Sequence, residues 1–161
     1  MDLSQYKELW TFLISMVPVI ELRGGLPFAL GSGIHPVLAW ILAIAGNFLP
    51  LPFILLFIRP IFKWMKKFRI FKKLVDKIEA RAMNKSDKVL KYSFWGLAIF
   101  VGLPLPGTGG WTGALIAALL DMRLKRAIPS ILIGLIIAAT LVTIVCYLVA
   151  SGATWLSWML G

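Results

Sequence analysis

Four long apolar stretches divide the chain, at residues 9–33, 37–58, 94–120 and 127–149. The second and the fourth carry no charged residue. Each is long enough to cross a bilayer core about 30 Å thick, which takes roughly 20 apolar residues in an α-helix. The pattern therefore predicts two full transmembrane helices, at 37–58 and 127–149.

The first and third stretches are broken by residues that do not favour a membrane helix. The first contains "PVIELRGGLP" at 18–27, and the third contains "GLPLPGTGGWTG" at 102–113. Proline removes a backbone donor and glycine weakens helix continuity. We therefore predict that 9–33 and 94–120 are re-entrant helical hairpins, which leave the membrane on the side that they entered.

Charge sets the orientation of these segments. Residues 59–91 hold 12 of the 17 Lys and Arg, and loops with such an excess stay cytoplasmic. If all four stretches crossed the membrane, the basic link "DMRLKR" at 121–126 would lie outside, against this tendency. Two hairpins and two spans place both basic segments in the cytoplasm and both termini outside. Four ordinary spans remain the alternative.

The basic segment 59–92 is predicted to form an amphipathic cytoplasmic helix. Its apolar side chains recur at helical spacing, at Phe68, Phe71, Leu74, Val75 and Ile78. Such a helix is expected to lie on anionic lipid headgroups of the cell (plasma) membrane. Docking of a partner protein is the alternative. Nucleic acid is not an expected partner, because the segment joins two membrane stretches.

The composition agrees with a single membrane domain. Of the 161 residues, 60% are hydrophobic, and the mean hydropathy is +0.88. The expected fold is therefore an all-α integral membrane protein with one domain, residues 1–161. No catalytic residue, metal or cofactor is expected, because the lone His35 and the lone Cys146 offer neither a catalytic set nor a ligand cluster.

The two halves of the chain have the same organisation: a broken hairpin, a short link and a full span. Placing residues 24–25 over 109–110 aligns the breaks and brings Gly46 within a few residues of Gly134. Inverted repeats with discontinuous helices are typical of secondary transporters. Two spans cannot easily surround two unwound tips, which must be covered by protein or line water, so a homodimer or higher homo-oligomer is predicted.

The first break places two charged side chains at membrane depth, where charges are costly and usually functional. If residues 20–25 are unwound, Glu21 and Arg23 point the same way. They then either pair with each other or divide the work, with Arg23 binding an anionic group and Glu21 carrying a proton. The alternative is a shallow hairpin whose charges reach the headgroups.

The second break has no charge but offers backbone N–H groups and hydroxyls at the start of a half-helix, "WTGALIAALL". Such a helix N-terminus is suited to an anion, and the alternative is tight-turn chemistry with close helix packing. Asn47 lies beside a proline kink and is predicted either to cap freed backbone groups or to line the pathway. The full candidate site for substrate or ion comprises Glu21, Arg23, Gly24, Gly25, Asn47, Thr108, Gly109, Gly110, Trp111 and Thr112.

Four of these features together resemble the small multi-drug export protein family over essentially the whole chain: "PVIELRGGLPFALGSG", "AGNFLPLP", the basic middle helix and "GLPLPGTGGWTGALIAALL". That family is similar to the DedA membrane proteins, whose fold has two opposed re-entrant hairpins. The resemblance implies that Glu21 matches the acidic residue of the first hairpin, and Arg23 a basic one beside it, in proton-coupled transport. Several DedA members are linked to recycling of undecaprenyl phosphate. The segment 102–113 departs from the DedA pattern because it has no arginine.

The sequence thus predicts a secondary transporter or lipid flippase of the DedA-like type, and no enzyme. It is expected to be proton-linked and to move an amphipathic, drug-like molecule or a lipid-carrier phosphate between the two hairpin tips. The alternative is a non-transporting membrane scaffold or integrity protein that binds anionic lipid through its basic helix.

Overall fold

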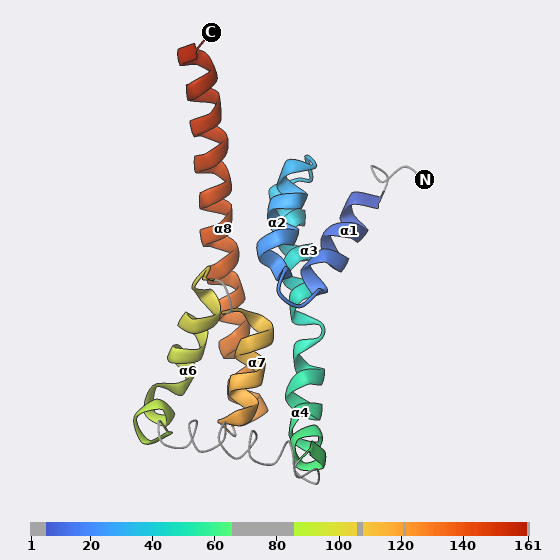
Figure 1. Ribbon diagram of the computed structural model, residues 1–161, viewed down its shortest axis with the longest axis vertical. Coiled ribbons are helices and arrows are strands. Elements are labelled where there is room, and N and C mark those ends of the chain that lie inside the picture. The colour runs from blue at the N-terminus through green and yellow to red at the C-terminus, as the bar shows by residue number, and fades with distance from the viewer. Residues whose placement is uncertain (1–5, 66–85, 106–107, 121, 161) are drawn as a thin grey trace.

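The computed structural model describes residues 6–65, 86–105, 108–120 and 122–160, and within these ranges every regular element is a helix (Figure 1). The fold is therefore all-α in the described part of the chain, as predicted. The amphipathic helix expected over 59–92 falls largely on residues 66–85, outside the described residues. The elements are α1 (Lys7–Met16), α2 (Glu21–Gly31), α3 (Pro36–Phe48), α4 (Leu51–Met65), α6 (Ser86–Gly102), α7 (Gly110–Leu119) and α8 (Leu124–Leu160).

Two helical runs are long and apolar enough to cross a membrane. The first, Pro36–Ile58, joins α3 to α4, and the second, Leu124–Gly152, lies within α8. They coincide with the two predicted spans, although α8 continues to Leu160. Between α3 and α4 the helix is interrupted at Leu49 and Pro50, where proline lacks the N–H that would continue the ladder.

The remaining helices form two hairpins, α1–α2 and α6–α7, which reach the middle of the molecule from opposite ends of its long axis (Figure 1). α1 packs on α2 and α3, while α6 packs on α7 and α8. The first turn comes earlier than predicted: it occupies residues 17–20, and α2 already begins at Glu21. The expectation that 20–25 is unwound is therefore wrong, and Gly24 and Gly25 are helical.

Local sequence explains the position of this turn. Val17 precedes Pro18 and is extended, as residues before proline prefer, so α1 ends there. The chain then reverses through positive φ values at Val19 and Glu21. Gly24 and Gly25 are not part of this turn and serve instead in helix packing.

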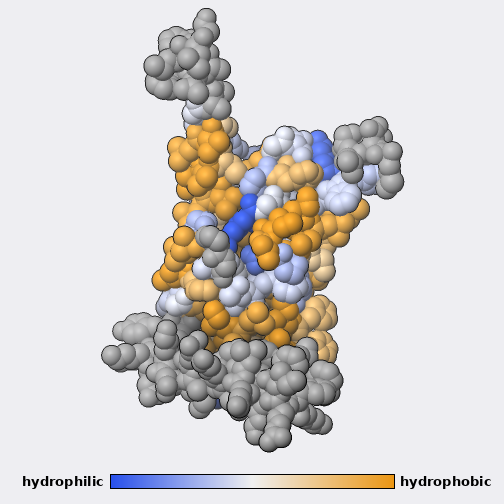
Figure 2. Space-filling model, in the orientation of Figure 1, coloured by the Kyte–Doolittle hydropathy of each residue, from blue (hydrophilic) through white to orange (hydrophobic). Residues whose placement is uncertain are grey.

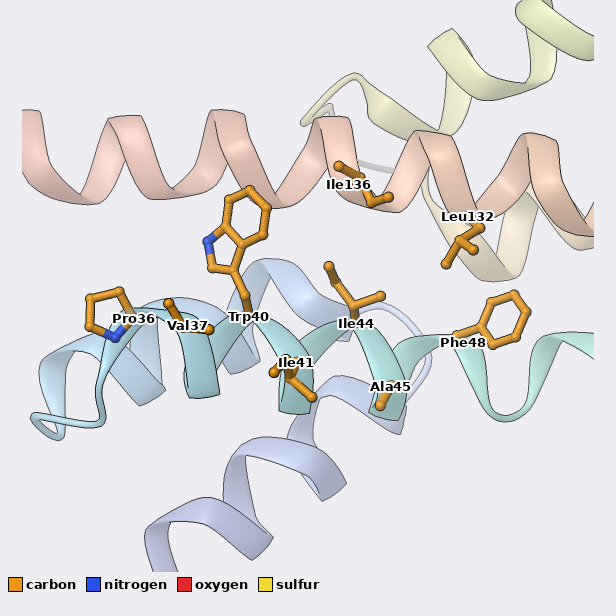
Figure 3. A pocket seen from close by; sticks show the side chains of 9 residues that line it. All are labelled: Pro36, Val37, Trp40, Ile41, Ile44, Ala45, Phe48, Leu132 and Ile136. Atoms are coloured by element: carbon orange, nitrogen blue, oxygen red, sulfur yellow. The ribbon is translucent and has the colours of Figure 1, made fainter.

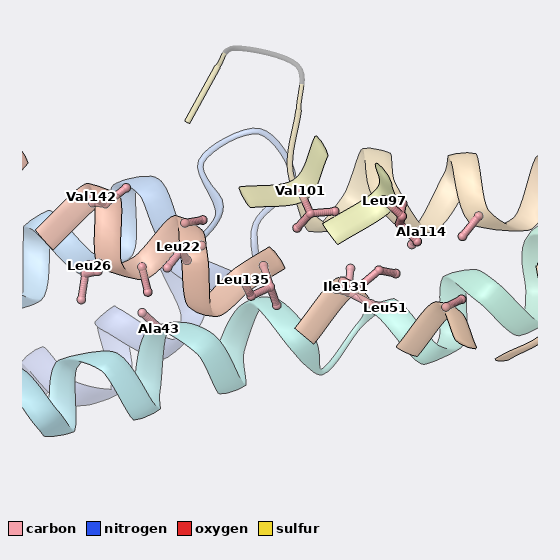
Figure 4. Close-up of a cluster of buried hydrophobic side chains, with 14 of the residues drawn as sticks. Leu22, Leu26, Ala43, Leu51, Leu97, Val101, Ala114, Ile131, Leu135 and Val142 are labelled. Atoms are coloured by element: carbon pink, nitrogen blue, oxygen red, sulfur yellow. The ribbon is translucent and has the colours of Figure 1, made fainter. Parts of the chain in front are cut away.

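The core forms where helices from both halves of the chain meet (Figure 4). Leu22 of α2, Leu51 of α4 and Val101 of α6 are buried together with Ile131 and Leu135 of α8. Many of the other buried positions are alanines, which let helix backbones approach closely in membrane proteins. These alanines are Ala29, Ala39, Ala43, Ala98, Ala114, Ala117, Ala118, Ala127, Ala138 and Ala139.

Two glycines of the spanning runs lie directly against hairpin backbone. A Cβ added to Gly46 would lie 2.3 Å from the carbonyl oxygen of Phe12, and one added to Gly134 would lie 2.7 Å from that of Ala98. Each span thus packs its glycine onto the first helix of the hairpin that precedes it. Gly46→Ala and Gly134→Ala are expected to reduce the free energy of unfolding by about 1–3 kcal/mol each, because overpacking at backbone cannot relax.

Thermal unfolding of the purified variants in detergent measures this effect. Gly96→Ala in α6 is the matched control, because a Cβ at Gly96 meets nothing within 4 Å. Alanine at that helical position is expected to be neutral or slightly stabilising. Equal melting temperatures for all three variants would show that the two close approaches do not constrain the fold.

Candidate functional site

Arg23, at the start of α2, reaches across to the turn of the second hairpin. Its guanidinium donates hydrogen bonds to the carbonyl oxygens of Leu103 (2.7 Å), Leu105 (2.8 Å) and Thr108, and to Thr108 Oγ1 (2.9 Å). A longer bond of 3.4 Å reaches the carbonyl of Val101 in the last turn of α6. Carbonyls at a helix C-terminus lack intrahelical partners and carry partial negative charge. Arg23 therefore caps α6 and anchors the turn that follows it.

Glu21 reaches the other end of the same turn. Its side chain is only 3% exposed, and its Oε1 accepts a hydrogen bond of 3.1 Å from the backbone N–H of Trp111. Trp111 is the second residue of α7, whose first N–H groups have no intrahelical partner and carry partial positive charge. Glu21 thus acts as a helix cap supplied from 90 residues away.

Gly109 makes this contact sterically feasible. It precedes α7 with φ of +139°, and a Cβ there would lie 2.2 Å from Glu21 Oε2. Any other residue would meet both an unfavourable backbone conformation and the carboxylate. The position of Glu21 therefore requires a glycine at residue 109.

Asn47 of α3 also approaches the first turn of α7. It is fully buried, and its Oδ1 would be 2.8 Å from a Cβ added to Gly110. Neither amide atom has a hydrogen-bond partner among the described residues, so the predicted capping of backbone at the proline kink is not observed. Glu21 Oε2, Arg23 Nε and Trp111 Nε1 are likewise buried without partners. Buried polar groups are normally paired, so this concentration makes the cluster the candidate functional site.

The structure thus brings together most of the predicted residues. Glu21, Arg23 and Asn47 meet the segment 108–111 where the two hairpins adjoin. Thr112 follows in the first turn of α7. Gly24 and Gly25 lie on α2 instead: a Cβ on Gly25 would fall 1.9 Å from Ser15 Oγ, which indicates packing of α2 on α1.

Sequence reasoning missed the carbonyl groups of Val101, Leu103 and Leu105 as parts of the site. Backbone groups leave no side-chain pattern, and the only signal was the pair of prolines in "GLPLPG", which frees carbonyls of the preceding turn. In this conformation those carbonyl oxygens occupy the terminal N–H groups of the Arg23 guanidinium.

Arg23→Lys is expected to destabilise the chain by about 1.5–3 kcal/mol, the range for hydrogen bonds to charged groups, because one ammonium cannot replace the planar fork. The melting temperature in detergent measures this. Arg126→Lys, at an exposed position near the start of α8, is the matched control and is expected to be silent. If Arg23→Lys has the same melting temperature as Arg126→Lys, the contacts of Arg23 do not hold the turn.

An apolar groove of about 700 Å³ lies between α3 and α8, apart from the polar cluster (Figure 3). Trp40 stands at the side of this groove and donates a hydrogen bond of 2.8 Å from Nε1 to Thr143 Oγ1. The lining is aliphatic and aromatic, so the groove suits a hydrocarbon chain. It is lined by Pro36, Val37, Trp40, Ile41, Ile44, Ala45, Phe48, Leu132 and Ile136.

The surface also separates a polar region from apolar ones. A small hydrophilic area interrupts a largely hydrophobic face at the height of the two turns (Figure 2). Two apolar helical runs long enough to cross a membrane, and buried charged residues where the two helical hairpins meet, indicate a helical membrane protein.

The chain belongs to the family described as "Putative small multi-drug export protein", whose model matches residues 21–141. The matched region begins at Glu21, directly after the first turn, and contains Glu21, Arg23 and the whole of the second break. No curated protein and no solved structure matched the chain. The wider similarity to DedA proteins stays a prediction.

Proposed function

We propose that the protein is a proton-linked secondary transporter that moves an amphipathic molecule past the point where its hairpins meet. The observation that carries this proposal is Glu21, a buried carboxylate with one oxygen on the N-terminus of α7 and the other without a partner. A carboxylate at membrane depth is costly and is retained where it carries protons or ions. The apolar groove beside α3 supports a substrate with a hydrocarbon part.

We also propose that the halves form an inverted repeat with re-entrant hairpins. Gly113 follows Gly25 by 88 residues, and Gly134 follows Gly46 by the same interval. The same shift carries the start of α3 to the start of α8. Each second hairpin helix also packs on a spanning run of the other half, α2 on α8 and α7 on α4. This register differs by three residues from the one that aligns 24–25 with 109–110.

Cysteine accessibility tests the topology. In a Cys146→Ser background, Leu124→Cys is expected to react only with reagents that reach the cytoplasm, because α7 returns to its side of entry. His35→Cys is the control, since residue 35 lies outside under both the hairpin model and the model of four ordinary spans. Labelling of residue 124 from outside would overturn the re-entrant hairpins and restore four spans.

Reconstituted vesicles with an imposed pH gradient test transport itself. The probes are a fluorescent alkyl phosphate and a fluorescent lipophilic cation, which make opposite demands on the site. Movement of at least one probe is expected to follow the direction of the gradient. Movement no faster than in protein-free vesicles, for both probes and both gradient directions, would contradict the proposal.

A scaffold that binds anionic lipid through 59–91 is the second candidate, favoured by the charge of that segment. It predicts that neutralising those lysines impairs binding to anionic vesicles and function in cells, whereas changing Glu21 does not. Loss of function on changing Glu21 alone would exclude it.

Exposed apolar residues in the two turns support a homodimer or higher oligomer. Val19 is 93% exposed and Leu105 is 54% exposed, both in turns between helices. Irregular segments at membrane depth need protein or water against them. A mass determination that finds only monomer in lipid nanodiscs would contradict this assembly.

A further inference from the structure

We infer that Glu21 occupies the binding place of a substrate oxyanion, and that the anion displaces this carboxylate from the N-terminus of α7 as the carboxylate takes up a proton. The inference rests on the proposed function, because it names the substrate group and the coupling step of the same site. The ligand chemistry is an oxyanion such as a phosphate or sulfate at the end of an apolar chain.

The buried polar atoms around α7 favour an acceptor-rich ligand. Within the described part of the chain, three donors there have no partner: Arg23 Nε, Asn47 Nδ2 and Trp111 Nε1. A fourth donor, the N–H of Trp111, is satisfied only by Glu21 Oε1. An oxyanion at the helix end has enough oxygen atoms to accept from several of these donors, as anions at helix N-termini commonly do.

The helix end is not the only evidence. Asn47 is fully buried, comes from α3 rather than from either hairpin, and places its Oδ1 against Gly110 of the first turn. A buried amide with neither atom paired is costly. Its Nδ2 has a use when an oxyanion is bound, and its Oδ1 can accept from a protonated Glu21 or from a hydroxyl of the ligand.

Charge balance sets the coupling. Glu21 and Arg23 are the charged pair of the cluster, and their opposite charges cancel. The other charged or titratable side chains that the structure describes on the packed elements lie elsewhere: Lys7, for example, donates to the carbonyl of Ser32 at the far end of α2. The rest are Tyr6 before α1, Glu8 on α1, His35 before α3, Arg123 before α8, and Lys125, Arg126, Cys146 and Tyr147 on α8; α7 carries none. Arg59 and Lys63 fall in the half of α4 away from Leu51, and Asp87, Lys88, Lys91 and Tyr92 fall in the half of α6 away from Val101.

An added anion would therefore leave one uncompensated negative charge in a buried place, at a cost of several kcal/mol. Protonation of Glu21 removes that charge. The carboxylate becomes a carboxylic acid. The N–H of Trp111 then donates to an oxygen of the ligand in place of Glu21 Oε1, and the positive charge of Arg23 balances the negative charge of the ligand. A monoanion thus binds together with one proton, and release of the proton restores Glu21 to the helix end.

Binding to the full chain in lipid nanodiscs tests this exchange. The probes are octyl sulfate, whose charge does not change with pH near neutrality, octyl phosphate, and octyltrimethylammonium. Calorimetry in two buffers of different ionisation enthalpy counts the protons taken up, and empty nanodiscs correct for partitioning into lipid. Glu8→Gln, which changes an exposed carboxylate of α1, is the matched control.

The wild type and Glu8→Gln are expected to take up about one proton per octyl sulfate bound, by the linkage of charge and binding. Glu21→Gln is expected to bind without proton uptake. Glu21→Ala is expected to bind about tenfold tighter than wild type because the competing carboxylate is gone, and Asn47→Leu about tenfold weaker. The same pattern with octyl phosphate indicates a general oxyanion site, and binding of only one of the two anions shows which oxyanion the site takes.

Several results would overturn the inference. These are binding of octyl sulfate by wild type without proton uptake, equal or weaker binding by Glu21→Ala, or binding of the cation alone. Each leaves the proposed function intact if vesicles still show transport. Conversely, proton-linked anion binding without movement in vesicles would contradict transport and leave this site standing.

Discussion

Glu21→Gln is expected to reduce substrate movement to the level of protein-free vesicles and to leave the fold intact. Glutamine keeps an oxygen that accepts from the N–H of Trp111, so the cap on α7 survives. It cannot take up and release a proton, so the step that couples substrate to the gradient is lost. We expect at least a tenfold decrease in initial rate, roughly the effect of 1.4 kcal/mol on a barrier.

Two measurements decide this prediction, the transport rate in vesicles and the melting temperature in detergent, each made for Glu21→Gln and for the control Glu8→Gln. Glu8→Gln is expected to match wild type in both. Glu21→Leu is expected to lose both transport and about 1–3 kcal/mol of stability, because the N–H of Trp111 is then buried without a partner. Wild-type transport by Glu21→Gln would exclude Glu21 as the proton carrier.

The arrangement of charges explains why the two breaks differ in sequence. The second break leaves carbonyl groups after α6 and N–H groups at the start of α7 without helical partners. The first break supplies Arg23 for the carbonyl groups and Glu21 for the N–H group of Trp111. A second break with its own charges would not need these partners. The asymmetry of the sequence is therefore a complementarity between the two turns, and it ties the hairpins to each other.

The elements of the fold could be predicted largely from local signals. Charge-free apolar runs marked the spans, and prolines with glycines marked the breaks, because these residues act on the helix in which they occur. The exact position of the first turn could not be predicted. It depends on Val17 before Pro18 and on positive φ at Val19 and Glu21, whereas the conspicuous glycines 24 and 25 pack inside α2.

The membership of the site was predictable, but its bonding was not. Charges at membrane depth pointed to Glu21 and Arg23, since their burial needs a reason. Their partners lie 78 to 90 residues away and, apart from Thr108 Oγ1, are backbone atoms, which local pattern cannot identify. Asn47 was expected either to cap freed backbone groups at its own kink or to line the pathway; tertiary packing places it against α7, and it does not cap the kink.

Gly109→Ala is expected to be among the most damaging single substitutions in the chain. The position combines φ of +139° with a Cβ only 2.2 Å from Glu21 Oε2. The backbone conformation alone costs about 1–3 kcal/mol for a residue with a side chain. Displacing a buried carboxylate adds overpacking of about 1–3 kcal/mol. Transport should be lost with the cap on α7.

Gly33→Ala separates these two costs, because Gly33 has φ of +74° and a Cβ there meets nothing within 4 Å. Gly33→Ala is expected to be destabilised only by backbone strain and to keep its transport activity. In a Glu21→Ala background, the cost of Gly109→Ala should fall by the part that is due to overpacking, since residues in contact couple in a double-mutant cycle. Melting temperatures of the four variants measure that coupling. A cost for Gly109→Ala that is the same with and without Glu21 would mean that the carboxylate does not occupy the start of α7, and the site would have to be built differently.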